Sequence, residues 1–403
     1  MPVTAVRIVS LSFISCLLAG TLASPPAALA QGAPAAAGTS ATGLSFEPPS
    51  SGYPSAIDPT AAAPLPAVAT DGSSEWVIAP IPNHSPSQGW ALGLIGQYIF
   101  HPAGTDPAQP PSILGGGIFA TQERSYGGAL GYVGHLDEDR WRVLAGAGYG
   151  LINYDFFGIG NNAALQDHPL HIEQDMTGVL LQGLREVAPS LYLGPRLTYL
   201  NINAAAKAES AFTALPPLEA ETQTVALGAK LQWDTRDNSF YPTSGNLANV
   251  TIDVFNGAYG SDFDYSAYEA EYNHYMSLSE KDVLALRGFG RYASGGAPFF
   301  DLSQFGQHND LRGYESGKYR DRFMLAGQGE LRHQLLDWLG VAGFAGIGEV
   351  AHDPASLTGD NLLWSFGGGL RLRIAHDNPV NFRVDVAQGE DGTVLYISVG
   401  EAF

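Results

Sequence analysis

The stretch Phe299–Gln334, with the sequence FFDLSQFGQHNDLRGYESGKYRDRFMLAGQGELRHQ, decides how the rest of the chain is interpreted. Its first part is rich in Gly and Asp and carries Leu311-Arg312-Gly313-Tyr314. Its second part alternates, with Leu325, Leu331 and Leu335 on one parity and Gln328, Glu330, Arg332 and Gln334 on the other. A period of two predicts a strand with one face in an apolar medium and the other in a polar one. A connection this long before a strand indicates a loop with a function.

Alternating segments of about ten residues, each followed by a turn signal, recur from Trp76 to Phe403, as in an outer-membrane β-barrel. The clearest are 89–100, 222–234, 362–375 and 380–387, where the charged residues keep to one parity. A soluble β-sandwich would also alternate. Aromatic residues at the segment ends, a Gly- and Arg-rich opposite face and a terminal Phe favour the barrel. No apolar run reaches the 18 or so residues that a transmembrane helix needs.

The sequence therefore predicts an all-β transmembrane antiparallel barrel of about 16 strands. The expected strands are 76–82, 89–100, 113–123, 126–136, 140–152, 175–187, 190–202, 222–234, 246–256, 265–277, 281–292, 322–335, 339–350, 362–375, 380–387 and 393–403. Short and long connections alternate between them, which places short turns at the periplasmic rim and long loops outside. The Pro-rich connection 101–112 is longer than this scheme expects.

Residues 1–30 are predicted to be a secretory signal peptide, because an apolar run after Arg7 ends at the small-x-small site Ala28-Leu29-Ala30. A membrane anchor would need about 20 apolar residues, and this run is shorter. A lipoprotein would need cleavage before Cys16, where the preceding residues form a poor lipobox. Residues 31–75 are rich in Ala and Pro and predict a disordered linker. The barrel is expected to occupy 76–403.

Composition argues against several classes of function. The chain has 20 basic and 40 acidic residues, which is unsuited to nucleic-acid binding. No Gly-x-Ser-x-Gly elbow and no nucleotide motif occur, and the histidines lack a metal-binding spacing on one strand face. His168 and His171 lie near acids and could hold a metal, but a solvated polar loop is the simpler interpretation. His274 and Ser277 lack a third partner for a hydrolase. We therefore expect no enzyme activity, no metal and no cofactor.

Five motifs in order resemble the barrel domain of the BamA-type outer-membrane assembly superfamily, also called bacterial surface antigens. They are Phe156–Asn161, Asp234–Gly245, Arg312-Gly313-Tyr314 with Glu330-Leu331-Arg332, Pro379–Ala387, and Gly400–Phe403. Two departures matter. The family usually has periplasmic POTRA modules before the barrel, which 31–75 cannot hold, so the resemblance implies a member without them. The family also carries Phe-x-Asp-x-Gly on the strand after Glu330, whereas here Gly346 stands in place of the acid.

The resemblance implies that the loop folds into the lumen and forms a latch of Arg312, Gly313, Tyr314 and Glu330. A guanidinium can bind a carboxylate in bidentate fashion. Gly313 permits close backbone approach, and Tyr314 has an apolar body with a polar tip. With the usual Asp absent, we expect Glu330 to carry most of the pairing. The simpler alternative is that Arg312 is an exposed loop arginine.

Further lumen residues are expected from the motifs and from strand parity. The lumen motif partners are Phe344, Gly346, Gly348, Arg332, Arg371, Arg383 and Asp385. With Arg287, Arg291 and Arg373, these arginines either form a cationic channel wall or pair with acids of the inserted loop (Asp301, Asp310, Glu315 and Asp321). We favour the plugged lumen. Tyr396, Gly400 and Phe403 are expected to form a C-terminal insertion signal.

The sequence thus predicts a bacterial outer-membrane barrel of the assembly or translocation type. It would insert or pass polypeptide or lipid through a plugged lumen or a lateral seam between its first and last strands. Pro80 and Pro82 in the first strand motivate a weak seam, because proline removes ladder donors. Expected partners are outer-membrane lipid, the barrel assembly machinery during its own insertion, and an unidentified periplasmic protein. The alternative is a passive channel or a structural surface antigen.

Overall fold

A computed structural model describes residues 75–85, 89–102, 110–160, 170–206, 221–306, 310–314, 317–373, 379, 381–390 and 392–403. The signal peptide and the linker expected at 1–75 lie outside these residues, apart from Glu75. In the described part of the chain, no helix is both long and apolar enough to cross a membrane.

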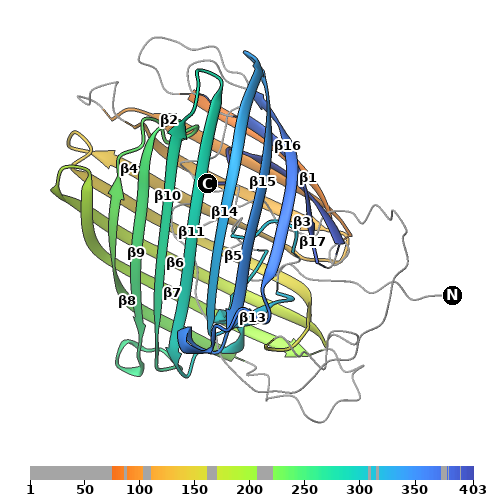
Figure 1. The fold of residues 1–403 in the computed structure, drawn as a ribbon. Coiled ribbons are helices and arrows are strands. Elements are labelled where there is room, and N and C mark those ends of the chain that lie inside the picture. The colour runs from red at the N-terminus through yellow and green to blue at the C-terminus, as the bar shows by residue number, and fades with distance from the viewer. Residues whose placement is uncertain are drawn as a thin grey trace, which may run out of the picture.

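The chain forms one antiparallel sheet of sixteen strands, so the predicted strand number is confirmed. The strands are β1 (Glu75–Ser85), β2 (Gly89–Phe100), β3 (Ser112–Thr121), β4 (Tyr126–Leu136), β5 (Trp141–Phe156), β6 (Leu170–Ala188), β7 (Leu191–Ala206), β8 (Glu221–Asp234), β9 (Gly245–Phe255), β10 (Tyr265–Ser277), β11 (Asp282–Gly295), β14 (Phe323–Leu336), β15 (Leu339–Ala351), β16 (Leu363–Arg373), β17 (Asn381–Gly389) and β18 (Gly392–Val399). Strands that are adjacent in this order are hydrogen-bonded to each other, so β11 pairs with β14. Figure 1 shows the strands tilted around a barrel.

Alternation along each strand sorts side chains between the two faces of the barrel wall. On β14 the side chains of Leu325 and Leu331 are exposed to 47% and 46%, whereas Glu330 between them is fully buried. The same outward apolar pattern holds around the sheet. Other outward-facing residues include Leu92, Leu94, Leu227, Leu231, Phe366 and Leu370. The outer face is therefore suited to lipid.

The connections differ between the two rims of the barrel. One rim, called here the short-turn rim, includes the turns 137–140, 189–190, 278–281 and 337–338. The turn 137–140 is tight because three consecutive residues, Asp137 to Asp139, take positive φ. The other rim carries the loops 256–264, 296–322 and 352–362, and lies at the bottom of Figure 1. The loops contain η1 (Gly257–Tyr259), η2 (Phe299–Asp301), β12 (Ser303–Gln304), β13 (Arg320–Asp321) and η3 (Pro354–Ser356). The end of β2 and the start of β3 lie on the short-turn rim, as expected, whereas most of the Pro-rich connection between them lies outside the described residues.

The sheet order has two ends, β1 and β18. No hydrogen-bonded strand pair joins β1 to β18 among the residues that the structure describes. Within the described residues, each of these two strands is therefore hydrogen-bonded along one edge only, and an edge without a partner is a row of backbone donors and acceptors that another strand can use.

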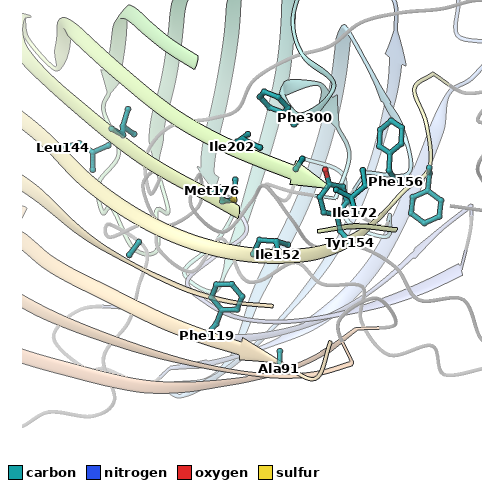
Figure 2. Close-up of a cluster of buried hydrophobic side chains, with 14 of the residues drawn as sticks. Ala91, Phe119, Leu144, Ile152, Tyr154, Phe156, Ile172, Met176, Ile202 and Phe300 are labelled. Carbon is teal, nitrogen blue, oxygen red and sulfur yellow. The ribbon is translucent and has the colours of Figure 1, made fainter. Parts of the chain in front are cut away.

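The alternation predicts an inner face that is polar throughout, but only part of the inner face of the barrel is polar. One side, called here the apolar wall, is a hydrophobic cluster on strands β2 to β7 joined by Phe300 of the loop after β11. Its other members are Ala91, Phe119, Ala129, Val133, Leu144, Ile152, Tyr154, Phe156, Phe157, Ile172, Met176, Leu180, Ile202 and Ala204. Figure 2 shows these side chains on the concave side of the wall.

The rest of the inner face, called here the charged wall, is formed by strands β8 to β17. Its buried polar side chains include Lys230, Asp253, Glu269, Asn273, Arg287, Arg291, Gln328, Glu330, Arg332, Glu349, Ser365, Arg371, Arg383 and Asp385. Buried charges need partners, so the charged wall must be an ion-pair network. The expectation of a polar lumen is right for this wall and only partly right for strands β2 to β7, which combine the apolar cluster with buried polar side chains such as Gln97, Gln174 and Arg196.

Several strand boundaries differ from expectation by four residues or more, among them the start of β6 and the ends of β7 and β18. β6 and β7 extend to Leu170 and Ala206, well beyond the predicted ends, although their outward residues become polar there. Tyr149 donates a hydrogen bond to Asp175 (2.6 Å) on this polar outer surface. β18 ends early, at Val399, because Gly400 takes a φ of 87° and turns the last residues off the strand.

Candidate functional site: a loop latch in the lumen

The loop 296–322 between β11 and β14 folds into the barrel interior. Phe305, Leu311, Arg312 and Tyr314 are each no more than 1% exposed, although they belong to a connection. Within the loop, β12 and β13 form a two-stranded sheet, where Ser303 pairs with Asp321. The exposed-arginine alternative for Arg312 is therefore wrong.

Arg312 at the loop tip contacts two buried carboxylates on different strands. Its Nη1 lies 2.7 Å from Glu330 Oε2 on β14 and 2.6 Å from Asp385 Oδ2 on β17. Its guanidinium carbon lies 3.4 Å from the centroid of the Phe344 ring on β15, a cation–π contact. Three strands thus hold one side chain.

This geometry corrects the expectation that Glu330 carries most of the pairing with Arg312. Asp385 is as close to the guanidinium as Glu330 is, so a second acid is present on β17 and not at Gly346. Both acids approach the same nitrogen, and among the described residues Nε and Nη2 of Arg312 have no hydrogen-bond partner. The contact is a shared one, not a bidentate pair.

Gly346 and Gly348 leave room for the loop. A Cβ atom at Gly346 would lie 2.9 Å from Leu311 Cδ1 and 2.6 Å from Gln328 Cγ. A Cβ atom at Gly348 would lie 2.7 Å from the Phe305 ring. These two glycines of β15 therefore leave space for the side chains of Leu311 and Phe305. The Phe344 ring of the same strand stacks on Arg312.

The two residues after Arg312 bind the last strands of the barrel. The Gly313 backbone N–H donates to the Tyr396 hydroxyl on β18 (2.8 Å), and Tyr314 donates to the Trp364 carbonyl on β16 (2.6 Å). Gly313 has a φ of 107°, and a Cβ atom there would lie 2.9 Å from the Gly389 nitrogen. Both the conformation and the space thus require glycine. Ser365 also donates to the Arg312 carbonyl.

The latch acids belong to a larger ion network at the C-terminal end of the barrel. Arg371 lies 3.2 Å from Glu330, contacts Asp385, and donates to Glu401 at 2.7 Å. Arg332 donates to Glu330 at 2.8 Å. Arg383 lies 3.5 Å from Asp385. Because each acid serves several arginines, removing one would leave several buried charges unbalanced.

The expected C-terminal residues take separate places in this network. Tyr396 holds Gly313 through its hydroxyl, as described above. Gly400 turns the chain inward, and its N–H donates to the Asn381 carbonyl (2.8 Å). The carbonyl oxygen of Phe403 accepts from Arg332 Nη2 (2.7 Å), and its ring lies 5.9 Å from the Arg332 and Arg287 guanidinium carbons. The terminal residue therefore faces the lumen arginines.

The remaining lumen arginines pair with acids of the wall. Arg287 pairs with Glu271 on β10, and Arg291 Nε lies 3.6 Å from Glu269. By contrast, Asp310 of the loop accepts from backbone N–H groups of Gly306 (3.3 Å) and Leu311 (2.9 Å). The expected pairing with loop acids is wrong for Arg287, Arg332 and Arg371, whose partners are wall acids. Asp301 accepts from Tyr265 (2.6 Å), and Glu315 lies outside the described residues.

Two other motifs also reach the loop or its network. Gly160, within the motif Phe156–Asn161, donates its backbone N–H to the Arg320 carbonyl (2.8 Å). In the turn 235–244, Asp237 accepts from the Thr243 (2.9 Å) and Ser244 (3.1 Å) backbones. The same turn brings the Tyr241 ring to 5.6 Å from the Arg332 guanidinium carbon.

Sequence reasoning missed Ser365, Trp364 and Glu401, although Ser365 lies on the inward parity of its strand. Among the described residues, no group of three His, Cys, Asp or Glu side chains is placed to bind a metal. His171 is described, whereas His168 lies outside.

With the geometry described, the chain can be compared with known proteins. The Omp85 superfamily domain matches residues 184–403. Searching the curated proteins found no significant match. Among solved structures, BamA from Haemophilus ducreyi lacking POTRA domains 1–3 is 15% identical with a TM-score of 0.52, covering 81% of this chain and 69% of that one.

Two CdiB structures are similar as well. CdiB from Escherichia coli is 10% identical with a TM-score of 0.54, covering 83% of this chain and 63% of that one. CdiB from Acinetobacter baumannii is 12% identical with a TM-score of 0.51, covering 81% and 65%. This chain thus spans about two thirds of the length of these structures. Their likeness shows the barrel fold, and the domain match covers more than half of the sequence. The chain belongs to the Omp85 superfamily of outer-membrane β-barrels.

Proposed function

We propose that this barrel inserts or passes polypeptide, or lipid, at the outer membrane through a lateral seam between β1 and β18. The observation that carries the proposal is the position of these strands at the two unpaired ends of the sheet order. An unpaired edge can accept a strand of a client by β-augmentation. In β1, Pro80 and Pro82 lack the N–H that a continuous ladder would need.

The buried loop supports this proposal over a passive channel. Leu311, Arg312 and Tyr314 fill space beside the charged wall and bind it tightly, so solutes would have to displace them. For this chain the identity of the client is part of the proposal. Its proposed partners are outer-membrane lipid, the barrel assembly machinery during its own insertion, and an unidentified periplasmic protein. We propose no catalytic role.

A disulfide across the seam tests the proposal. We expect cysteines placed near Ile78 and Ile397 to abolish function when oxidised, with recovery on reduction. Function is measured by depleting the protein, supplying the variant, and quantifying the other outer-membrane proteins and surface lipids. The matched control places cysteines at Leu284 and Leu331, which are already register partners on β11 and β14. Full activity of the oxidised seam variant would sink the proposal.

Conductance in planar bilayers separates the passive-channel alternative. A plugged barrel is expected to show small, unstable currents that rise in Arg312→Ala, because the loop tip loses its two acids. Large, steady pores that do not change in Arg312→Ala would instead indicate a porin-like channel.

A further inference from the structure

The loop tip is fastened to the last hairpin of the barrel as well as to β14, β15 and β16. Gly313 binds the hydroxyl of Tyr396 on β18, and Arg312 binds Asp385 on β17. The turn after β17 also contacts the tip, since the Glu390 N–H donates to the Tyr314 hydroxyl at 3.4 Å. The backbones of Gly313 and Gly389 are so close that a Cβ atom on either would clash.

The second acid of the latch lies on β17 for a steric reason. On β15, the position where the resembling family carries Asp is Gly346, and Leu311 and Gln328 occupy the space that a side chain would need. Asp385 approaches the guanidinium from β17, two strands further along the sheet. An acid on β15 would tie the loop to the middle of the charged wall, whereas one on β17 ties it next to the seam.

Among the strands, β18 is the one whose position depends most on the loop. Its ladder runs along β17 only, and it has no described partner on its other edge. The hydroxyl of Tyr396 joins it to the loop as well. The tail beyond β18 is held separately, because Glu401 binds Arg371 (2.7 Å) and Asn381 (2.7 Å).

We propose that the loop tip is a clamp on the β17–β18 hairpin, so that withdrawal of the loop and loosening of β18 are one event. Asp385 and Tyr396 are its positioning residues, because they hold Arg312 and Gly313 in place. The clamp itself does not depend on the proposed function. Only the use that the protein makes of a loosened β18 rests on that function. It is a property of the free barrel and is measured without a client.

Hydrogen exchange of the mature protein in lipid nanodiscs tests the clamp. Tyr396→Phe removes one hydroxyl, and Asp385→Asn removes one charge. In both variants we expect amides of 392–399 and of the loop tip to exchange about three- to tenfold faster, the effect of losing one or two hydrogen bonds. Adding Asp385→Asn to Arg312→Ala should change β18 exchange little further, because both act through the same contact.

Two controls match these changes on other strands. Tyr192→Phe removes a hydroxyl that donates to Asp139 (2.9 Å), and Asp253→Asn removes a lumen acid 3.2 Å from Arg196. Both should leave β18 exchange unchanged. Gly346→Asp combined with Asp385→Asn should not restore protection, because Leu311 occupies the site. Folding is checked by the heat-modifiable migration of the barrel, and Tyr396→Phe, which keeps the ring, remains informative if Asp385→Asn does not fold.

The outcomes separate the clamp from the proposed function. Faster exchange at the loop tip with unchanged exchange of β18 in Tyr396→Phe would overturn the clamp. Faster exchange of both, with assembly of other outer-membrane proteins unaffected even by the oxidised seam, would leave the clamp standing and remove the proposed function.

Discussion

The two inner walls of the barrel are stabilised in different ways. The apolar wall packs Phe119, Leu144 and Met176 in a cluster whose contacts have no required direction. The charged wall holds Glu330, Asp385 and four arginines in a network where each contact depends on the others. A packed cluster weakens gradually when it is altered, whereas a shared ion network fails when one member leaves. The charged wall is therefore the side suited to a reversible contact.

The loop touches both walls at different points along its length. Its root lies against the apolar wall, where the Phe299 and Phe156 ring centroids are 5.3 Å apart and Phe300 is part of the cluster. Its tip lies in the charged wall through Arg312. The difference between the walls predicts that the tip can leave while the root stays packed.

Removing Glu330 should have the largest effect. Glu330→Ala leaves Arg312, Arg332 and Arg371 without their shared acid, and we expect unfolding to become easier by about 3–5 kcal/mol. The measurement is the urea midpoint of the barrel in detergent or lipid. The control is Glu349→Ala, a buried acid that accepts one hydrogen bond, from Gly359 (3.0 Å). Equal losses of stability in both variants would show that Glu330 is not shared among several arginines in the way that the network requires.

Truncation in the apolar wall should cost less and leave the latch intact. Leu180→Ala opens a cavity in the cluster, and we expect a loss of about 2–4 kcal/mol in the free energy of unfolding. Its neighbour Leu181, 47% exposed on the outer face, is the matched control, since its truncation opens no internal cavity. Loop-tip hydrogen exchange should stay at the wild-type rate in both. A loosened tip in Leu180→Ala would break the distinction between the walls.

Sequence reasoning reached the barrel and the loop but not the two walls. Period-two alternation predicts the faces, because lipid demands apolar residues on every outward position, such as Leu325 and Leu331. It constrains the inner face much less, since the lumen accepts either paired charges or a packed cluster. Inward residues such as Met176 and Leu180 were therefore not recognised as a core. Alternation likewise does not predict the polar outer ends of β6 and β7, because hydrogen bonds and not contacts with lipid stabilise them.

The latch shows the same limit at the level of single residues. The family resemblance implied that Arg312 on the loop meets Glu330 on the following strand. Asp385 was recognised as a lumen residue, but its partner depends on which strands the loop tip crosses. That crossing is decided by Leu311 against Gly346, a packing contact that no spacing in the sequence encodes.

Substitution of Gly313 tests whether the backbone of the loop tip must lie close to the charged wall. Gly313→Ala combines an unfavourable φ of 107° with a contact to the Gly389 nitrogen, and we expect about 1–3 kcal/mol of loop destabilisation. The readout is more frequent current openings in planar bilayers. Gly288→Ala is the control, because a Cβ atom there meets nothing within 4 Å. Unchanged currents in Gly313→Ala would mean that the tip is not closely seated.

The smallest effect is expected at the short-turn rim, outside both walls, where water can titrate the side chains. Burial raises the pKa of the Asp139 carboxyl, but hydrogen bonds from His135 (2.7 Å) and Arg142 (2.7 Å) outweigh it and lower the pKa to about 2. A lowered pKa gives stability that is full above the ordinary value near 4 and is lost as the pH falls toward 2, at most about 2 kcal/mol. Urea midpoints of wild type and Asp139→Asn should therefore converge between pH 4 and pH 2. Parallel curves would contradict the assignment. Because Glu330 and Asp385 of the charged wall are fully buried, a much larger acid effect would mean that protons reach the charged wall, and the comparison of the two walls would have to include solvent access.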